Sequence, residues 1–383
     1  MNSLPLGNMP LDTFLSEYWQ KKPLLIRNGI ANITSPLTGE ELAGLACEQD
    51  IESRLVINHP ETHAWDLQHG PFNDEVFSTL PKSHWTLLVQ AVDHWIPQAA
   101  QLLEQFNFIP RWRIDDLMMS YANDGGGVGP HFDNYDVFLV QTSGTRHWEI
   151  GSQYNDHAAL IENLPVKILK EFTPTESWLL EPGDILYVPP GVGHNGIAKG
   201  DGCITYSIGY RAPSHSDILR EYTDYIGDQL SESQRYQDAD LIPQDNTGEI
   251  TEHTIEKLQC IIKNYSEDKE AIRQWFGHYI TTPKYSEQHI LCNSITKEQL
   301  TQHLESGKLI HRNESSRFAY QLIDNNYRLY VDGDHIETAE NQQELIKLLC
   351  SEITFTKSTI HTTEPHLLLL LTLLNRGALY LQE

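Results

Sequence analysis

Two short stretches of this sequence carry side chains that could bind a metal ion. His131 and Asp133 stand two residues apart, directly after the glycine-rich run 125–129. Side chains two residues apart on a β-strand point to the same face, so an imidazole and a carboxylate here could take neighbouring positions on one ion. We interpret the glycine run as a flexible entrance loop, because it lacks the Lys-Ser/Thr of a phosphate-binding P-loop. The competing interpretation of His131 and Asp133 is an ordinary hydrogen-bonded pair.

A third ligand comes from the second stretch. Residues 181–194 read EPGDILYVPPGVGH, in which a Pro-Gly-Asp turn precedes a strand, Pro-Pro ends it, and His194 opens the next strand. Two histidines and one carboxylate form the facial triad of non-haem Fe(II) oxygenases, which leaves positions open for substrate or oxygen. The sequence therefore predicts an Fe(II) site made by His131, Asp133 and His194, with a plain loop histidine as the alternative for His194.

An Fe(II) site of this type needs a source of electrons to activate oxygen. A 2-oxo acid can supply two electrons while it chelates the iron, and 2-oxoglutarate would also need a cation for its distal carboxylate. Arg146 stands about one strand away, at the predicted start of the strand after 137–141, and its planar guanidinium suits a carboxylate. Ser120, on the strand before the glycine run, could add a hydroxyl donor. The alternative for Arg146 is an exposed arginine of a β-turn.

These residues lie in a region whose pattern indicates β structure. Between 111 and 211, short β runs alternate with Gly and Pro, a pattern typical of a sandwich, barrel or jelly roll. The clearest runs are 136–140, 147–150, 184–188 and 203–208.

The N-terminal part has a helical pattern instead. Residues 9–30 predict a short amphipathic helix followed by an extended apolar run. Thr38 with Glu41 fits a capping box that opens a second helix. Apolar residues recur at helical spacing across 82–106, which we interpret as one long buried helix.

The pattern changes again after Pro213. Residues 214–257 hold eleven acidic and three basic side chains, and their helical spacing predicts an acidic helical segment. This segment is either a solvated face, or a dimer arm or steering surface for a basic protein. The tail 276–383 mixes helical pieces with short strands, typical of a small α+β domain, and its apolar run 367–374 predicts the core of the last helix.

Length and net charge limit the number of domains and the classes of partner that we expect. The 383 residues suggest two or three domains, and the 27 basic against 53 acidic residues give a net charge of −26. That charge argues against direct nucleic-acid binding and suits a cationic protein partner. No apolar run approaches the ~20 residues of a membrane span, and we see no signal peptide. Five scattered cysteines without a CxxC pair are typical of reduced thiols, so we expect a cytoplasmic protein.

The sequence resembles the bacterial JmjC-type ribosomal oxygenases, a cupin-fold family that includes an arginine hydroxylase of large-subunit ribosomal protein sixteen. The resemblance covers about residues 1–213 well and the tail only loosely. The residues that carry it lie at 125–138, 146–148, 182–194 and 207–213, with further matches upstream at 18–23, 52–55 and 70–72.

The resemblance implies a fold that is mainly β with α. A double-stranded β-helix, the cupin or JmjC jelly roll, with helical N-terminal decoration would form a catalytic domain over 1–213. Residues 214–275 would be an acidic helical dimerisation segment, so that the protein is a homodimer. Residues 276–383 would form a C-terminal winged-helix-like α+β domain.

The resemblance also implies an activity. Family members bind Fe(II) through the positions of His131, Asp133 and His194 and hold 2-oxoglutarate with those of Arg146 and Ser120. They use O2, release succinate and CO2, and hydroxylate an arginine side chain of a large-subunit ribosomal protein, while eukaryotic relatives hydroxylate histidine. Demethylating JmjC relatives usually bind the distal carboxylate with lysine, so Arg146 fits the ribosomal branch better.

A cationic substrate would require acidic and aromatic side chains near the metal. Our candidates are Asp124, Tyr135 and Asp136, for which turn capping and strand packing are the plain alternative. Two other functions remain open. One is a JmjC demethylase or another 2-oxoglutarate oxygenase with a different substrate, and the other is a non-catalytic cupin module that binds basic protein.

Overall fold

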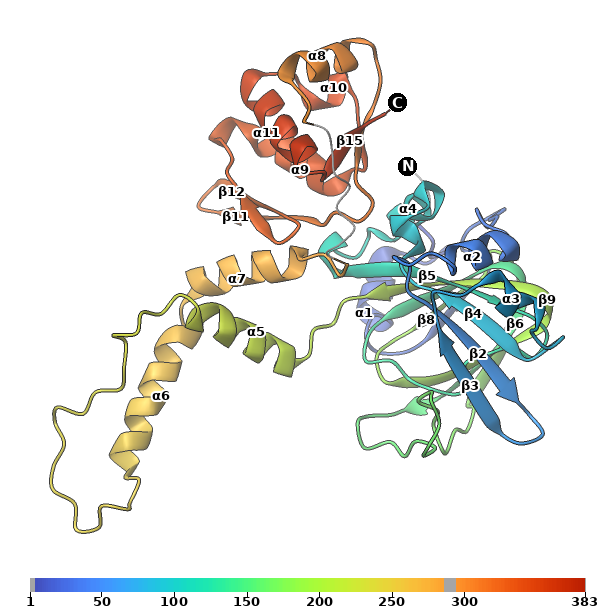
Figure 1. The fold of residues 1–383 in the computed structure, drawn as a ribbon, viewed down its shortest axis with the longest axis horizontal. Helices are drawn as coiled ribbons and strands as arrows, with labels where there is room; N and C mark the ends of the chain where they lie inside the picture. The colour runs from blue at the N-terminus through green and yellow to red at the C-terminus, as the bar shows by residue number, and fades with distance from the viewer. Residues whose placement is uncertain (1–3, 286–293, 383) are drawn as a thin grey trace. The chain divides into compact units, whose positions relative to one another are not determined.

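The computed structural model describes residues 4–285 and 294–382 (Figure 1). It divides into two compact units, Met1–Ala212 and Pro213–Glu383. Among the described helices, none combines the length and the apolar character that a membrane span requires. Cys47, Cys203 and Cys260 are free thiols, whereas Cys292 lies outside the described residues.

The first unit is built on one nine-stranded sheet with antiparallel pairing throughout. Its order is β1-β8-β6-β9-β5-β4-β2-β3, with β7 paired to β6. The strands are β1 (Leu24–Ile26), β2 (Ser53–His59), β3 (Ala64–His69), β4 (Trp85–Val89), β5 (Ile114–Ala122), β6 (Val137–Gln153), β7 (Glu176–Leu180), β8 (Ile185–Val188) and β9 (Val192–Tyr210).

Strands β6 and β9 are long and bent. The sequence predicts separate short runs at 136–140 and 147–150, but both lie in the single strand β6. The pairing of β6 with β9 shifts register near Ser143, where Gly144 takes a left-handed φ of +62°. Such bulges bend a strand without ending it. The runs at 184–188 and 203–208 correspond to β8 and part of β9.

The alternation of side chains along these strands separates two clusters of buried residues. Phe138 and Tyr187 belong to a large core that also contains Phe14 and Phe106 from the N-terminal helices. Their strand neighbours Val137, Leu139, Leu186 and Val188 form a second cluster with Trp148 and Val192. The sheet is therefore apolar on both faces. Val192 of the second cluster stands two residues before His194 on β9, so the two side chains share a face.

Two predictions for the N-terminal part are confirmed. The helix α1 (Leu11–Glu17) is followed by strand β1. The helix α2 (Gly39–Leu45) begins with the predicted capping box: the Thr38 hydroxyl accepts from the Glu41 N–H, and the Glu41 carboxylate accepts from the Thr38 N–H.

The prediction of one long helix over 82–106 is wrong. The segment forms β4, a 3-10 turn η1 (Val92–His94), the helix α4 (Pro97–Leu103) and a further turn η2 (Glu104–Phe106). Strand β4 lies between β2 and β5 and is buried on both faces, so its mostly apolar residues do not alternate and also match the spacing of a helix. Ala91, at φ 51°, ends the extended segment, and Pro97 starts α4 at a position where its missing N–H costs nothing. Short elements α3 (Asp74–Ser78) and η3 (Arg111–Arg113) complete the unit.

The second unit begins with the helix α5 (His215–Gly227), capped by Ser214 and Asp217. Residues 228–251 then run without helix or strand before α6 (Glu252–Ser266) and α7 (Lys269–Thr281). The predicted helical segment 214–257 is therefore interrupted, in a stretch that holds Pro243 and Gly248 and buries no side chain. The predicted boundary at 275/276 falls inside α7, which packs against the strands that follow it.

The rest of the second unit is the predicted mixture of helices and short strands. The apolar run 367–374 lies in α11 and contributes Leu370, Leu373 and Leu374 to the core, as predicted. Two three-stranded sheets have the orders β14-β10-β15 and β11-β12-β13. The elements are α8 (Lys297–Glu305), β10 (Ile310–Arg312), β11 (Phe318–Ile323), β12 (Asn326–Val331), β13 (Asp334–Ile336), η5 (Glu340–Gln342), α9 (Gln343–Ser351), β14 (Thr354–Phe355), α10 (Lys357–Ile360), α11 (Glu364–Asn375) and β15 (Leu379–Leu381).

Candidate metal centre

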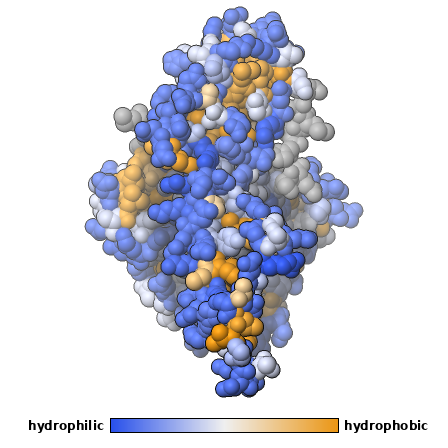
Figure 2. Space-filling view, turned by 90° about the vertical axis from the view of Figure 1, so that its left-hand side faces the viewer, coloured by the Kyte–Doolittle hydropathy of each residue, from blue (hydrophilic) through white to orange (hydrophobic). Residues whose placement is uncertain are grey.

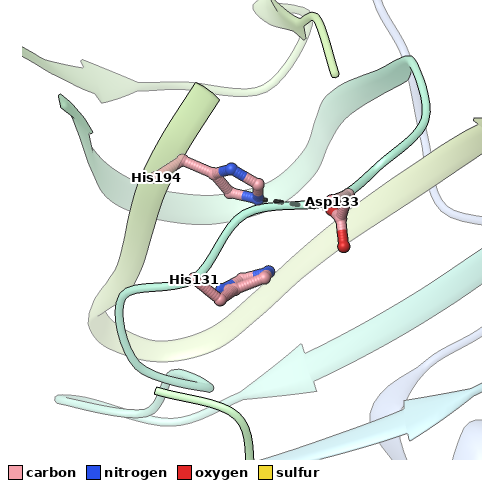
Figure 3. Close-up of side chains that lie close together, drawn as sticks. All are labelled: His131, Asp133 and His194. Atoms are coloured by element: carbon pink, nitrogen blue, oxygen red, sulfur yellow. Dashed lines mark ion pairs between the residues drawn. The ribbon is translucent and has the colours of Figure 1, made fainter. Parts of the chain in front are cut away.

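His131, Asp133 and His194 lie together at one end of the first unit's sheet (Figure 3). One ligand atom from each side chain lies within 4.8 Å of the other two. Asp133 Oδ2 is 3.6 Å from His194 Nε2, and the two imidazole rings are 4.3 Å apart between centroids. The 3.6 Å between Asp133 Oδ2 and His194 Nε2 suits two ligands of one ion, because metal–ligand bonds of about 2.1 Å place two donors at most about 4.2 Å apart.

The local structure of the first two ligands differs from the predicted strand. His131 forms an isolated bridge with His194, in which each backbone N–H donates to the other's carbonyl. The chain then leaves the sheet, so Asp133 lies in a loop, where its carbonyl oxygen accepts from the Gly191 N–H at 2.7 Å. The shared direction of the two side chains therefore comes from one bridge and a tied loop, and the period of a strand does not produce it.

Backbone carbonyls orient both imidazoles. Nδ1 of His131 lies 2.8 Å from the Gly129 carbonyl oxygen, and Nδ1 of His194 lies 3.0 Å from that of Val192. Because a carbonyl only accepts, each Nδ1 carries the proton and each Nε2 keeps a lone pair for a metal. Burial, with repulsion from His131, lowers the pKa of His194 to about 4, so its ring is neutral as a ligand must be.

The glycine run packs closely against the sheet, and its interpretation as a flexible loop is wrong. The Gly125 N–H donates to the Ala198 carbonyl, and the Ala198 N–H donates to that of Gly126. A side chain on Gly127 would come within 2.5 Å of the Gly196 carbonyl oxygen. Gly129 has a φ of +82°, which other residues rarely adopt, and its carbonyl is the one that orients His131.

Arg146 is a buried residue on β6, with 3% of its surface exposed, which contradicts the exposed-arginine alternative. Its Nη1 donates to the hydroxyl oxygens of Ser120 at 3.2 Å and Thr205 at 3.3 Å, and its Nη2 lies 3.5 Å from the Gly196 carbonyl oxygen. Its Nε is buried without a hydrogen-bond partner, and among the described residues it forms no ion pair. Its Cζ lies 5.3 Å from the centre of the Trp148 ring, and burial lowers the pKa of the guanidinium. A buried cation without a carboxylate partner among the described residues favours an anionic ligand.

Of the predictions for the three candidate substrate residues, the one for Asp136 is wrong. Its side chain is fully buried, and its carboxylate accepts from the Tyr187 hydroxyl at 2.6 Å and from Gln20 Nε2 at 2.9 Å. Arg113 forms an ion pair with it at 3.3 Å. With its oxygens used in this way, Asp136 joins the N-terminal helices to the sheet and has no surface to offer a substrate.

Asp124 and Tyr135 differ in their surroundings. Asp124 is exposed, and its carboxylate accepts from the Gly200 N–H at 2.7 Å, a turn-capping role. Tyr135 lies two residues after Asp133, and 43% of its surface is exposed. Its pKa is raised by burial of the hydroxyl and by the nearby charges of Asp133 and Asp116, so the phenol stays protonated and can donate.

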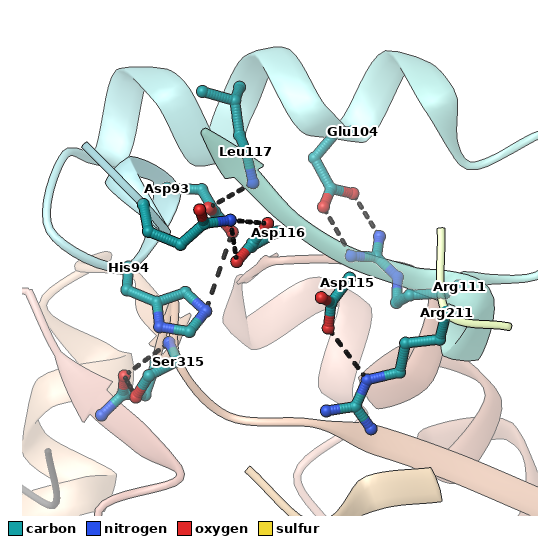
Figure 4. Close-up of polar contacts among 11 residues, drawn as sticks. Asp93, His94, Glu104, Arg111, Asp115, Asp116, Leu117, Arg211 and Ser315 are labelled. Carbon is teal, nitrogen blue, oxygen red and sulfur yellow. Dashed lines mark hydrogen bonds and ion pairs between the residues drawn. The ribbon is translucent and has the colours of Figure 1, made fainter. Parts of the chain in front are cut away.

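Asp116, which the sequence reading did not consider, is a buried carboxylate whose charge acts on Tyr135. It lies on β5 with 3% of its surface exposed, and both carboxylate oxygens accept from Gln90 Nε2 at 2.9 Å (Figure 4). Gln90 in turn accepts from Arg54 at 3.3 Å. Asp116 lies where the pairing of β5 with β9 shifts register, so the period of a regular strand could not have identified it.

A second buried carboxylate, that of Asp93, is hydrogen-bonded to the backbone of the same strand, β5. It accepts from the Leu117 N–H at 2.8 Å, and the ring of His94 lies 3.9 Å away (Figure 4). Burial raises its pKa to about 6, and the nearby negative charge of Asp116 adds to the shift, while His94 opposes it. We regard Asp93 as structural, because it fixes the turn η1 to β5.

With this geometry established, comparison with known proteins assigns the family. The JmjC domain family matches residues 101–218, and the ROXA-like winged helix family matches residues 264–380. The ribosomal protein uL16 3-hydroxylase of Escherichia coli (strain K12) is 38% identical over 275 residues, 71% of each chain. This chain belongs to the JmjC-domain ribosomal oxygenases. A probable ribosomal oxygenase of Haemophilus influenzae is 31% identical over 345 residues, covering 85% of this chain and 82% of that one.

Solved structures of ribosomal oxygenases agree with the fold. An X-ray structure of E. coli YcfD superposes with a TM-score of 0.88 at 31% identity, over 98% of this chain and 99% of that one. A YcfD structure in complex with cobalt and 2-oxoglutarate gives a TM-score of 0.86 with the same identity and coverage. The predictions of a JmjC fold with a C-terminal winged helix, and of a 2-oxoglutarate-dependent oxygenase that uses a metal, are thereby confirmed.

Proposed function

We propose that this ribosomal oxygenase hydroxylates an arginine side chain of a large-subunit ribosomal protein, with Fe(II) bound by His131, Asp133 and His194. The observation that carries the proposal is the triad in the same unit as Arg146, a buried guanidinium without a carboxylate partner in the described chain. The E. coli relative is a hydroxylase of ribosomal protein uL16, which supports the choice of substrate. Such a substrate would place the reaction in the cytoplasm.

The ladder between β6 and β9 supports a ligand that reaches from the triad to Arg146. Arg146 pairs with Ala198, while His194, on the same strand as Ala198, pairs with Ile150. The backbones of Arg146 and His194 are thus separated by roughly 13 Å, at ~3.3 Å per residue. An arginine side chain and a five-carbon diacid can bridge this length together, with the oxo acid end at the metal and the distal carboxylate at Arg146.

Each group in the site has a distinct task in the proposed reaction. When bound, Fe(II) would supply the activation of O2 that converts 2-oxoglutarate to succinate and CO2 and oxidises the substrate carbon. Arg146 would hold the distal carboxylate, while Ser120 holds Arg146 through the hydrogen bond between them. The buried apolar side chains of Trp148 and Val192 would limit the access of water to this face of the sheet.

A cationic substrate side chain is supported by the charge around the metal. The negative charges of Asp133 and Asp116 both raise the pKa of Tyr135. A guanidinium at this place would be attracted by both negative charges and would lie beside the partly exposed phenol of Tyr135. The net charge of −26 would also attract a basic ribosomal protein at long range.

The identity of the products tests the reaction class. Full-length protein incubated with Fe(II), 2-oxoglutarate, air and a ribosomal protein should form succinate in step with one added oxygen per substrate. Formaldehyde from a methylated substrate would instead indicate a demethylase. Absence of succinate with every substrate would leave the non-catalytic binding module.

We also propose that a second copy of the chain covers α6, which would make the protein a homodimer. Apolar side chains remain exposed on one face of this helix and along the segment before it, and Figure 2 shows apolar surface near the lower tip of the molecule, where this part lies. Exposed apolar groups that gather in this way mark protein interfaces. They are Leu241, Ile242, Ile250, Ile255, Leu258, Ile261 and Ile262.

A further inference from the structure

We propose that Gln141, acting through Thr205, is a positioning residue that presents one edge of the Arg146 guanidinium to the distal carboxylate of the cosubstrate. The inference rests on the proposed role of Arg146 in binding that carboxylate. Gln141 and Thr205 are both buried within the first unit, at 0% and 1% exposure. Neither carries a charge, so neither can neutralise the arginine that they orient.

The orientation of the Gln141 amide follows from its neighbours. Its Nε2 donates to the Ser143 carbonyl oxygen at 2.7 Å and approaches the Gly144 carbonyl oxygen at 3.4 Å. Reversing the amide would bring its oxygen against these two acceptors, which is unfavourable. Oε1 of Gln141 therefore faces Thr205, whose hydroxyl lies 2.9 Å away.

The Gln141 amide fixes the role of the Thr205 hydroxyl. A hydroxyl has one hydrogen, and that of Thr205 is donated to Gln141 Oε1. Only lone pairs of Thr205 remain for Arg146 Nη1 at 3.3 Å. Ser120 is held in the same way, since its hydroxyl donates to the Thr205 carbonyl at 3.1 Å and accepts from Nη1 at 3.2 Å. In this arrangement the Ser120 hydroxyl is an acceptor for Arg146, and its donation to the cosubstrate stays a prediction.

These contacts decide which edge of the guanidinium is open. Both hydrogens of Nη1 are used by the two hydroxyls. Nε is buried without a partner, and Nη2 has only the long contact of 3.5 Å to Gly196. Nε and Nη2 lie on the same edge of a guanidinium, and this edge can bind a carboxylate through two parallel hydrogen bonds. The neutral chain from Gln141 to Thr205 thus leaves a full positive charge and a bidentate edge for the ligand.

Binding of two oxo acids to the full-length protein tests the inference. The acids are 2-oxoglutarate and pyruvate, which has the same metal-binding end but lacks the distal carboxylate. Calorimetry would be done without oxygen on the Mn(II)-loaded protein. Thr205→Val removes the hydroxyl at nearly constant shape, and we expect it to weaken 2-oxoglutarate binding on the order of tenfold, because a hydrogen bond to a charged group is lost. Binding of pyruvate and of Mn(II) should be unchanged, and Thr205→Ser should restore the affinity for 2-oxoglutarate.

A general packing role would weaken both acids equally in Thr205→Val, or would weaken Mn(II) binding, and either result would overturn the inference. So would an unchanged preference for 2-oxoglutarate over pyruvate. Gln141→Met should reduce this preference in the native background but add little to Thr205→Val, since Gln141 acts through Thr205. Fully additive effects would show that the two residues act independently and would also overturn it.

The variant Arg146→Met distinguishes the positioning role of Gln141 and Thr205 from the proposed binding of the distal carboxylate by Arg146. If this variant keeps the preference for 2-oxoglutarate, the proposed role of Arg146 itself fails. If it loses the preference while Thr205→Val keeps it, Arg146 binds the carboxylate and only the positioning role of Gln141 and Thr205 is wrong.

Discussion

His131 and His194 are joined by a pair of backbone hydrogen bonds, with the N–H of each donating to the carbonyl of the other at 3.0 and 2.8 Å. The two ligands thus form one bridge of the sheet, although they come from distant parts of the sequence. Their spacing is set by the backbone before any metal is present. We therefore expect the site to bind metal without rearrangement of the fold.

Loss of one ligand should remove metal and turnover together. His131→Ala leaves two donors, and we expect Mn(II) affinity measured by calorimetry to fall at least tenfold, with no detectable succinate formation. The exposed His157→Ala serves as the matched control and should behave like the native protein. Full activity of His131→Ala would contradict metal binding by the triad.

Conservative replacement of Arg146 should separate charge from geometry. Arg146→Lys keeps a cation but loses the bidentate edge, so the KM for 2-oxoglutarate should rise by about tenfold. Arg146→Ala leaves no cation, and the KM should rise further, by about a hundredfold. The check is succinate formation at varied 2-oxoglutarate concentration, and an unchanged KM in both variants would move the carboxylate site elsewhere.

Asp116 should affect the protein substrate more than the cosubstrate. Asp116→Asn keeps the shape but removes the charge proposed to meet the guanidinium, so kcat/KM for the ribosomal protein should fall by ~10–100-fold. The KM for 2-oxoglutarate should stay the same. Asp124→Asn is the control, because Asp124 is exposed and caps the turn at Gly200. A larger loss in Asp124→Asn than in Asp116→Asn would reverse the assignment.

Asp93 should make stability depend on pH. Its pKa is raised from an ordinary 3.8 to about 6, so the folded protein holds this proton more tightly than the unfolded chain. Its ionisation is therefore a cost that is present above about pH 6 and relieved as the pH falls. Asp93→Asn should raise the free energy of unfolding at pH 8 by about 3 kcal/mol, seen as a higher thermal midpoint than that of the native protein, with a smaller difference at pH 5. A difference that does not change with pH would contradict the shift.

A charge on the exposed face of α6 should disrupt the proposed dimer. Ile262 is 69% exposed, and Ile262→Glu would place a carboxylate within the apolar face. Sedimentation should give a dimer for the native chain and a shift toward monomer for this variant. Asn264→Glu, on the opposite face of the helix, should sediment like the native chain. A native chain that sediments as a monomer would end the homodimer proposal.

The candidate site could be predicted from the sequence where its signal is local. The two segments that hold His131, Asp133 and His194 are short motifs with fixed spacing, and Arg146 follows on the next predicted run. Asp136 was misread because its partners Gln20 and Tyr187 lie far away in the sequence, and only the fold brings them together.

The fold was predictable where a side-chain pattern fits only one type of secondary structure. The capping box of Thr38 and the apolar run in α11 belong to this class. Strand β4 does not, because a segment that is buried on both faces has few polar positions and loses the alternation of a half-buried strand. The roles of Gln141 and Thr205 depend on hydrogen bonds across a bent ladder, which no sequence pattern reveals.

The most direct test of the central claim is the mass of a ribosomal substrate after reaction. Ribosomal protein uL16 would be incubated with the full-length protein, Fe(II), 2-oxoglutarate and air, and analysed by intact-mass and fragment-mass spectrometry. We predict a gain of one oxygen on an arginine residue, which is absent with His131→Ala. Succinate formation without any gain in mass would contradict uL16 as the substrate, and a gain of oxygen that persists in His131→Ala would contradict the metal centre itself.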